Sequence, residues 1–333
     1  MKRKLLLFLI IVLGLITTAC GKTSEKDVIK DLTKKIEDSK SYHLVGELEM
    51  INNDDVYKYD VDVSFEKNEK FRVSLKNKIN NHEQIILKND DGVYVLTPSL
   101  NKSFKFQSEW PYNNSQSYLL QTILLDIKND KDKEFVSNDD GYVITTKVNY
   151  TSNKELLKQK VYIDKNINIK EVHVLNKDNK VMMKMKFSEI DLKTTYNKNH
   201  FVLKDNMETA IIKEEVKVVS KIEDIIYPMY MPKNTKLTSQ DRVTKENGER
   251  IISTFSGDKT FMLVQETSTR EKELITIPLT GEPLILTGTI AAMSDSSITW
   301  SRDGIDYYLV SDEIEDEELL NIAKSISVMP VGK

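Results

Sequence analysis

Hydrophobic and polar residues alternate with a period of two over most of the first two-thirds of the chain. Residues 56–65 show the pattern most clearly, because Tyr57, Tyr59, Val61, Val63 and Phe65 fall on one face. The alternation recurs in residues 41–50, 71–75, 84–87, 93–96, 102–107, 142–148, 158–164, 169–175 and 181–190. Short polar turns such as Asp90-Asp91-Gly92 separate these segments. The pattern predicts antiparallel strands joined by hairpins, which curl into a half-barrel.

Two segments have helical spacing instead. Residues 24–38 begin with Ser24 and Asp27, which form a plausible capping box, and continue with apolar residues three and four apart. Residues 115–128 follow a Trp-Pro turn and place Leu119, Leu120, Ile123, Leu124 and Ile127 on one face, with Ser115 or Ser117 as the expected cap. We expect these helices to act as lids over the apolar face of the sheet.

The chain is long enough for two domains, since roughly 310 residues remain after the leader described below. We predict an α+β protein in which residues 20–210 form a curved antiparallel half-barrel with helical lids. Residues 211–333 form a second, small α+β domain. Its expected strands are residues 249–255, 260–265, 284–291, 297–302 and 305–310, followed by a helix over 313–325.

The strand faces define a candidate groove. Alternation assigns to its lining the residues Tyr59, Val61, Val63, Val73, Leu75, Ile86, Val93, Val95, Met183, Met185 and Phe187. The candidate lid and hinge consist of Trp110, Pro111, Tyr118, Leu119, Leu120, Ile123 and Leu124. An ordinary packed core would show the same apolar stripe, and that interpretation is favoured about two to one. Trp110 could gate the groove or plug the end of the sheet.

The N-terminus has the form of a lipoprotein signal peptide. Lys2, Arg3 and Lys4 precede twelve residues without a polar side chain, too few to span a bilayer, which needs ~20. Thr17-Thr18-Ala19-Cys20 follows, although bacterial lipoboxes usually carry Leu at the position of Thr17. Cys20 is the one cysteine of the chain. We therefore predict cleavage after residue 19, a diacylglyceryl anchor on Cys20, and a location on the extracytoplasmic face of the cytoplasmic membrane.

Charge and motifs exclude several kinds of chemistry. Removing residues 1–19 takes the formal net charge from −4 to −7, and no basic cluster predicts a nucleic-acid partner. The four histidines, His43, His82, His173 and His200, lack metal-ligand spacing and are expected to be solvated. No P-loop, G-x-G-x-x-G or G-x-S-x-G motif is present. We expect no catalytic residues, no metal and no cofactor, and hence no enzyme.

The stretch from Ser108 to Leu120, with Trp110-Pro111 followed by Tyr118-Leu119-Leu120, resembles the LolA-like lipoproteins of spore-forming Gram-positive bacteria. The likeness covers about residues 25–207, and residues 223–326 resemble a small domain of Firmicute surface proteins. Known members act in sporulation and germination, and true LolA carriers are soluble whereas this chain is expected to be tethered. The leading hypothesis is a binding lipoprotein whose groove holds an acyl chain or a partner segment. The alternative is a docking regulator of a cell-wall enzyme.

Overall fold

The computed structural model describes residues 23–52, 55–151, 153–211, 220–286 and 288–327, so the predicted signal peptide and Cys20 lie outside the described residues. Two compact units are present, residues 1–38 and 39–333. The first contains helix α2 (Glu25–Glu37), which begins with the predicted capping box of Ser24 and Asp27. Val28, Leu32 and Ile36 form its buried stripe. Among the described helices, none combines the length and apolarity that a membrane span requires.

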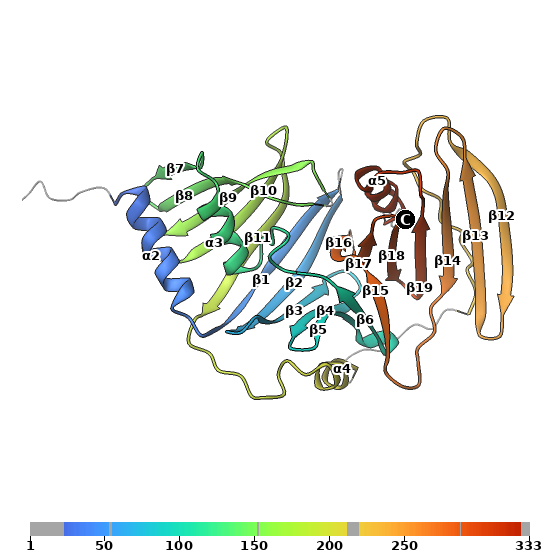
Figure 1. The fold of residues 1–333 in the computed structure, drawn as a ribbon, viewed down its shortest axis with the longest axis horizontal. Coiled ribbons are helices and arrows are strands. Elements are labelled where there is room, and N and C mark those ends of the chain that lie inside the picture. Colours follow the sequence, from blue (N-terminus) through green and yellow to red (C-terminus); the bar gives the residue numbers. More distant parts are fainter. Residues whose placement is uncertain (1–22, 53–54, 152, 212–219, 287, 328–333) are drawn as a thin grey trace, which may run out of the picture. The chain divides into compact units, whose positions relative to one another are not determined.

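The second unit is mostly β and contains two sheets (Figure 1). The larger sheet runs in the order β15-β6-β5-β4-β3-β2-β1-β11-β10-β9-β8-β7, and its end strands do not pair with each other within the described chain. Its strands are β1 (Ser41–Asn52), β2 (Asp55–Glu66), β3 (Lys70–Asn77), β4 (Glu83–Asn89), β5 (Gly92–Thr97), β6 (Lys102–Gln107), β7 (Glu134–Ser137), β8 (Gly141–Lys147), β9 (Leu156–Asp164), β10 (Ile169–Asn176), β11 (Val181–Asp191) and β15 (Ile275–Thr280). Short hairpins join β1 to β6 and β7 to β11 into two meanders, as the polar turns predict, and the antiparallel pairing of β1 with β11 joins these into one sheet.

The register places the alternating apolar residues on one face, which we call the apolar face. Val63 pairs with Val73, Val73 with Ile86, and Ile86 with Val95. On the other side of β1, Leu48 pairs with Met185. Because paired residues of antiparallel strands share a face, one apolar surface runs across the sheet.

The opposite face is polar over most of the sheet but is covered over β4 and β5. Ile85, Leu87, Tyr94 and Leu96 point to this side and pack with Phe201 and Met207. Met207 lies on helix α4 (Leu203–Ile211). The consecutive run Ile85-Ile86-Leu87 is therefore buried on both faces, as in strands covered by two layers.

The smaller sheet runs in the order β12-β13-β14-β19-β18-β17-β16. Its strands are β12 (Lys236–Lys245), β13 (Gly248–Ser256), β14 (Phe261–Thr267), β16 (Glu282–Leu286), β17 (Thr289–Ser294), β18 (Ser297–Arg302) and β19 (Ile305–Val310). Helix α5 (Asp316–Ser327) packs Leu319, Leu320 and Ala323 against Leu263, Ile298 and Leu309. The sheet and α5 thus have a core of their own.

One segment takes part in both sheets. β15 joins the larger sheet by parallel pairing with β6, from Ile275 opposite Lys102 to Thr280 opposite Gln107, and β16 follows at once in the smaller sheet. Gly281 makes the turn between them with φ +120°, and a Cβ there would lie 1.9 Å from the carbonyl oxygen of Met293. Only glycine fits this position. The domain boundary expected near residue 211 stays a prediction.

Several sequence-based expectations were wrong in detail. Neither Ser115 nor Ser117 caps the second helix, because α3 (Leu120–Asn129) begins after Leu119 and has no side-chain cap. Ser115 instead pairs with Asn149, whose N–H donates to its hydroxyl at 2.8 Å. The single strand expected over residues 284–291 is the hairpin of β16 and β17. β7, β12, β15 and α4 were not predicted.

Candidate functional site

All of the predicted groove residues lie on the apolar face. Tyr59, Val61, Val63, Val73, Leu75, Ile86, Val93, Val95, Met185 and Phe187 are buried, and Met183 is half-buried. Val61 is 1% exposed and Met185 is fully buried, although both lie at the middle of long strands. Positions that would line an open groove are therefore covered by other parts of the molecule.

The predicted lid and hinge residues account for part of this cover. Trp110, Pro111, Tyr118, Leu119, Leu120, Ile123 and Leu124 are all buried. The Trp110 ring meets the edge of Phe71, an apolar-face residue, with ring centroids 5.9 Å apart. The backbone N–H of Trp110 donates to the hydroxyl of Ser108 at 2.9 Å, and Ser108 in turn bonds Glu282 of β16. Trp110 thus packs on the apolar face, and its role as a gate or a plug stays a prediction.

Polar contacts attach helix α3 to the same face. The hydroxyl of Tyr42 donates to Gln121 at 2.6 Å, and the amide of Gln159 donates to the carboxyl of Asp126 at 2.9 Å. Ser115 also bonds Asp126, yet desolvation dominates and raises the pKa of this carboxyl to about 7. Asp126 is therefore a titratable group beneath the helix that covers the sheet.

The smaller sheet covers the apolar face around β4 and β5, and Gln84 of β4 makes the central contact. Its side-chain oxygen accepts from the Ile290 N–H at 2.6 Å and from the Thr289 hydroxyl at 2.9 Å. Its side-chain nitrogen donates to the Ile290 carbonyl at 3.4 Å. The side-chain amide of Gln84 thus bonds both the N–H and the C=O of Ile290, as the backbone of a neighbouring strand would. Gln84 is buried.

Two further apolar-face residues bind the same turn. The hydroxyl of Tyr59 accepts from the Gly288 N–H at 2.6 Å, and Asn77 donates to the Gly288 carbonyl at 3.4 Å. Desolvation raises the pKa of Tyr59 well above its ordinary range, so the hydroxyl stays protonated. Three polar side chains within the apolar face therefore satisfy backbone groups of β17 and the turn before it.

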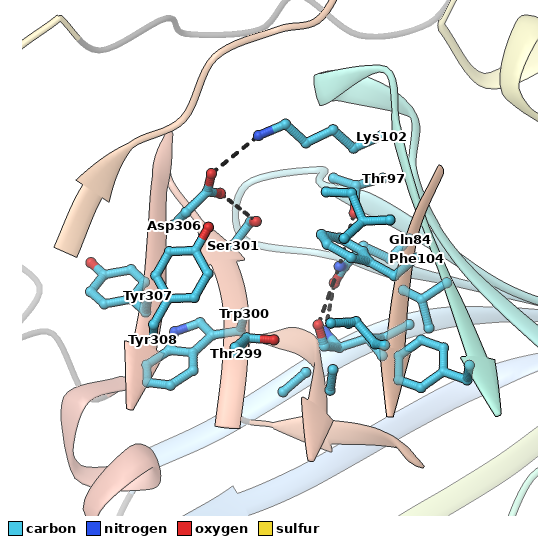
Figure 2. Close-up of a pocket in the computed structure, with 17 residues that line it drawn as sticks. Gln84, Thr97, Lys102, Phe104, Thr299, Trp300, Ser301, Asp306, Tyr307 and Tyr308 are labelled. Carbon is cyan, nitrogen blue, oxygen red and sulfur yellow. Dashed lines mark hydrogen bonds and ion pairs between the residues drawn. The ribbon is translucent and has the colours of Figure 1, made fainter. Parts of the chain in front are cut away.

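A cavity of about 100 Å³ remains between the two sheets (Figure 2). Phe104, Phe106, Ile277, Leu279, Ile290 and Ala292 supply most of its apolar lining. Lys102 and Asp306 form a buried ion pair at one side, with 3.1 Å between nitrogen and oxygen. Ser268 and Ser301 each donate to the other oxygen of Asp306 at 2.6 Å, so the carboxylate is fully bonded.

A second hollow lies at the ends of β8, β9 and β10. Its volume is about 390 Å³, and it is open to solvent beside Tyr142, Tyr162, Asp164, Lys170 and Glu171. Asp164 bonds Asn168 and the backbone of Asn166, which keeps the pKa of this carboxyl low and commits it to its own turn. The hollow is therefore a surface depression in which Asp164 is already bonded.

The four histidines do not form a cluster, and those with a side-chain partner each have a different one. His43 meets Asp62 at 3.0 Å, His173 meets Glu171 at 2.9 Å, and His200 meets Ser64 at 2.9 Å. All four histidines are half-buried and so less solvated than expected. Burial lowers the pKa of both His82 and His200. Within the described residues, no three His, Cys, Asp or Glu side chains come together as metal ligands.

Sequence reasoning missed the residues that join the sheets. Gln84, Lys102 and Asp306 each occupy one position in an alternating strand, where a polar residue indicates a solvated face. In the structure, Gln84 and Lys102 stand in register with apolar-face residues of their neighbours. That register could not be known without the pairing.

These features define a mostly β protein in which an open sheet with a buried apolar face is closed by a smaller sheet. The chain is 37% identical to the sporulation protein YdcC of Bacillus subtilis (strain 168) over 316 residues, which are 94% of this chain and 93% of that protein. The chain belongs to the family of this sporulation protein. The expected relationship to sporulation proteins is thereby confirmed. No family model matches the chain.

Solved structures share less. A complex of MucA and MucB from Pseudomonas aeruginosa matches with TM-score 0.33 and 11% identity over 91% of this chain and 97% of that one. A LolA superfamily protein from Nitrosomonas europaea matches with TM-score 0.32 and 11% identity, over 55% of this chain and 100% of that one. The structure of the CwlD amidase with the GerS lipoprotein from Clostridioides difficile matches with TM-score 0.23 and 16% identity, over 53% of this chain and 98% of that one. Similarity at this level transfers no function.

The Gln84 contact predicts a specific loss of stability. Gln84→Leu keeps the volume but leaves the buried Ile290 N–H without an acceptor, so we expect the free energy of unfolding to fall by about 2 kcal/mol. Urea denaturation measures the change. Lys186→Ala, on the exposed face of β11, serves as the control and should change stability by less than ~0.5 kcal/mol. Equal losses in the two variants would contradict a structural role for Gln84.

Asp126 predicts a pH-dependent difference between variants. Because its pKa is raised from 3.8 to about 7 on folding, stability falls as pH rises from about 4 to about 7 and is then constant. Asp126→Asn removes this effect, so the variant should gain stability over the native chain above pH 7, by at most roughly 4 kcal/mol, and lose the advantage near pH 4. Urea titrations at several pH values test this. Asp139→Asn, in an exposed turn, should give no such difference.

Proposed function

We propose that this protein is a non-enzymatic lipoprotein, anchored through Cys20 at the extracytoplasmic face of the cytoplasmic membrane, which acts in sporulation by docking a partner protein. The burial of the apolar face carries the proposal, because a filled interior leaves the outer surfaces for recognition. Membership of a sporulation protein family supports the process. The resemblance to LolA-like lipoproteins suggests a cell-wall enzyme as the partner.

The cavity dimensions favour docking over carriage of a lipid. Ligand pockets commonly measure ≈ 300–1,000 Å³, and the cavity between the sheets is about 100 Å³. An acyl chain gains ~0.8 kcal/mol for each methylene that it buries, so a space for only a few carbons gives weak binding. The polar groups beside this cavity, Lys102 and Asp306, already bind each other.

The binding of a hydrophobic ligand or partner segment in the apolar face is the second candidate. The apolar lining of the cavity favours it, as does the half-burial of Phe104, Ile277 and Leu279 along one side. Binding of this kind requires the smaller sheet or α3 to move away from the apolar face. Both candidates share the membrane anchor and the absence of catalysis.

A charge placed on the apolar face separates the two candidates. Under the docking proposal Val61→Asp and Met185→Asp bury an unpaired charge in packed core, and we expect both to abolish cooperative unfolding. The native chain should then show no saturable uptake of anilinonaphthalene sulfonate. Val136→Asp, at an exposed position of β7, is the control and should fold normally. Folded Val61→Asp protein that has lost a saturable probe site would instead support the ligand-binding candidate.

The anchor is tested by Cys20→Ala. Without the thiol no diacylglyceryl group can be attached, so we expect nearly all of the protein to leave the membrane fraction, since lipid chains and not apolar surface hold it there. Circular dichroism should show an unchanged fold. A variant that still sediments with membranes as the native chain does would show that Cys20 is not the anchor.

A further inference from the structure

Residues 222–232 cross the smaller sheet on the side that α5 covers. At the start of this segment, Arg242 of β12 donates to the carbonyl of Ile222 at 3.4 Å. Further along, Gln265 of β14 binds both backbone groups of Ile226. The Ile226 N–H donates to the side-chain oxygen of Gln265, and the side-chain nitrogen of Gln265 donates to the Ile226 carbonyl, each at 2.9 Å. The segment is therefore fixed to two strands of the sheet.

The inward side of this segment is apolar and stiff. Ile226 and Met231 pack against the core that α5 shares with the sheet. Pro228 and Pro232 are buried, and the ring of a proline fixes one of its two backbone dihedral angles. Because the segment is already held in one conformation, little ordering is required when it meets a partner.

Three large side chains of the same segment are exposed to solvent. Met229 is 76% exposed, Tyr227 45% and Tyr230 42%, and we call these three residues the Tyr-Met cluster. The amide of Gln240 donates to the Tyr227 hydroxyl at 3.0 Å, and the Tyr230 hydroxyl donates to Glu318 at 3.3 Å. Both rings are thus held by their hydroxyl groups. Tyrosine and methionine are enriched at protein interfaces relative to the rest of the surface.

Acidic residues lie beside the Tyr-Met cluster. Residues 222–232 and 311–323 together contain eight Asp or Glu and neither Lys nor Arg, and all of these acids except Glu318 are exposed. Glu318 bonds both Tyr230 and Lys259, which brings the second stretch next to the cluster. The hydrogen bond to Glu318 and the nearby charge of Glu315 raise the pKa of Lys259, so Glu315 belongs to the same neighbourhood. The surface around the cluster is therefore negative.

We propose that the Tyr-Met cluster and the acidic residues beside it dock a partner protein that presents an apolar pocket bordered by Lys or Arg. The proposal rests on the docking function proposed above and names the surface that performs it. A few large anchors that fill pockets carry most of the binding energy of a protein interface. Complementary charge around them steers the encounter and excludes wrong partners.

Two other occupants fit this surface less well. A membrane that contains anionic lipids attracts basic segments and would repel the exposed carboxylates. A second copy of this chain, joined by the two-fold symmetry that most homo-oligomers use, would bring the same acidic surface against itself. Like charges brought together at an interface are destabilising, so the site favours a different protein.

Crosslinking in sporulating cells identifies the partner, and binding to the purified partner then tests the surface. A photo-crosslinking residue at position 229 of the full-length chain should join it to another protein. Met229→Ser removes the most exposed anchor, so we expect the full-length variant to bind that partner at least about tenfold more weakly. Ile79→Ser is the matched control, because Ile79 is 72% exposed in the turn after β3, and it should bind as the native chain does.

The acidic residues are tested by their response to salt. The double variant Glu315→Gln/Asp316→Asn should bind the partner more weakly than the native chain at low ionic strength. The difference should shrink at high ionic strength, because salt screens exposed charges. Asp139→Asn/Asp140→Asn removes two charges from an exposed turn elsewhere and should bind as the native chain does. Urea denaturation checks that every variant folds.

Several outcomes would overturn the proposal. They are the lack of any crosslink from position 229 to another protein, a crosslink from there to a second copy of this chain, equal binding by Met229→Ser and Ile79→Ser, and an affinity that is independent of salt. Binding of Cys20→Ala protein to phosphatidylglycerol vesicles that is lost with Met229→Ser would assign the cluster to the membrane instead. Partner crosslinks from position 79 and not from position 229 would reject this surface and leave the docking function standing. Saturable uptake of anilinonaphthalene sulfonate without any crosslink would reject the docking function itself.

Discussion

The structure depends on the passage of residues 275–286 from the larger sheet into the smaller one. β15 completes the edge of the first sheet, and Gly281 turns the chain so tightly against the carbonyl of Met293 that β16 must begin in the second. The smaller sheet is thereby held over the apolar face by the covalent chain itself. This constraint contributes to the burial of the apolar face, together with α3 and the Trp110 turn.

Polar groups then determine how the two sheets fit. An apolar contact alone is tolerant of sliding, whereas Gln84 accepts and donates to the same residue, Ile290, and so specifies one alignment. Tyr59 and Asn77 make the same kind of contact one turn away. The Lys102–Asp306 pair lies beside the remaining cavity, where its two serine bonds satisfy the carboxylate. A buried ion pair of this kind fixes the alignment of the two sheets more than it increases the free energy of unfolding.

The sequence predicts the parts of the fold that local pattern controls. The period of two in residues 56–65, the capping box at Ser24 and the apolar face shared by Val63, Val73 and Val95 are all present. β15 and β12 escaped prediction because their patterns carry little information: β15 contains a proline, and β12 buries none of its residues. Gln84 escaped because its partner is 206 residues away. Alternation reveals which residues share a face, and it does not reveal what covers that face.

The same distinction bears on function. A stripe such as Tyr59, Val61 and Val63 looks identical in a ligand groove and in a packed core, and only the cover decides between them. Here the cover comes from α3, the Trp110 turn and the smaller sheet, all within one chain. Under the docking function proposed above, a partner protein would be recognised by surface groups that do not pack within the fold.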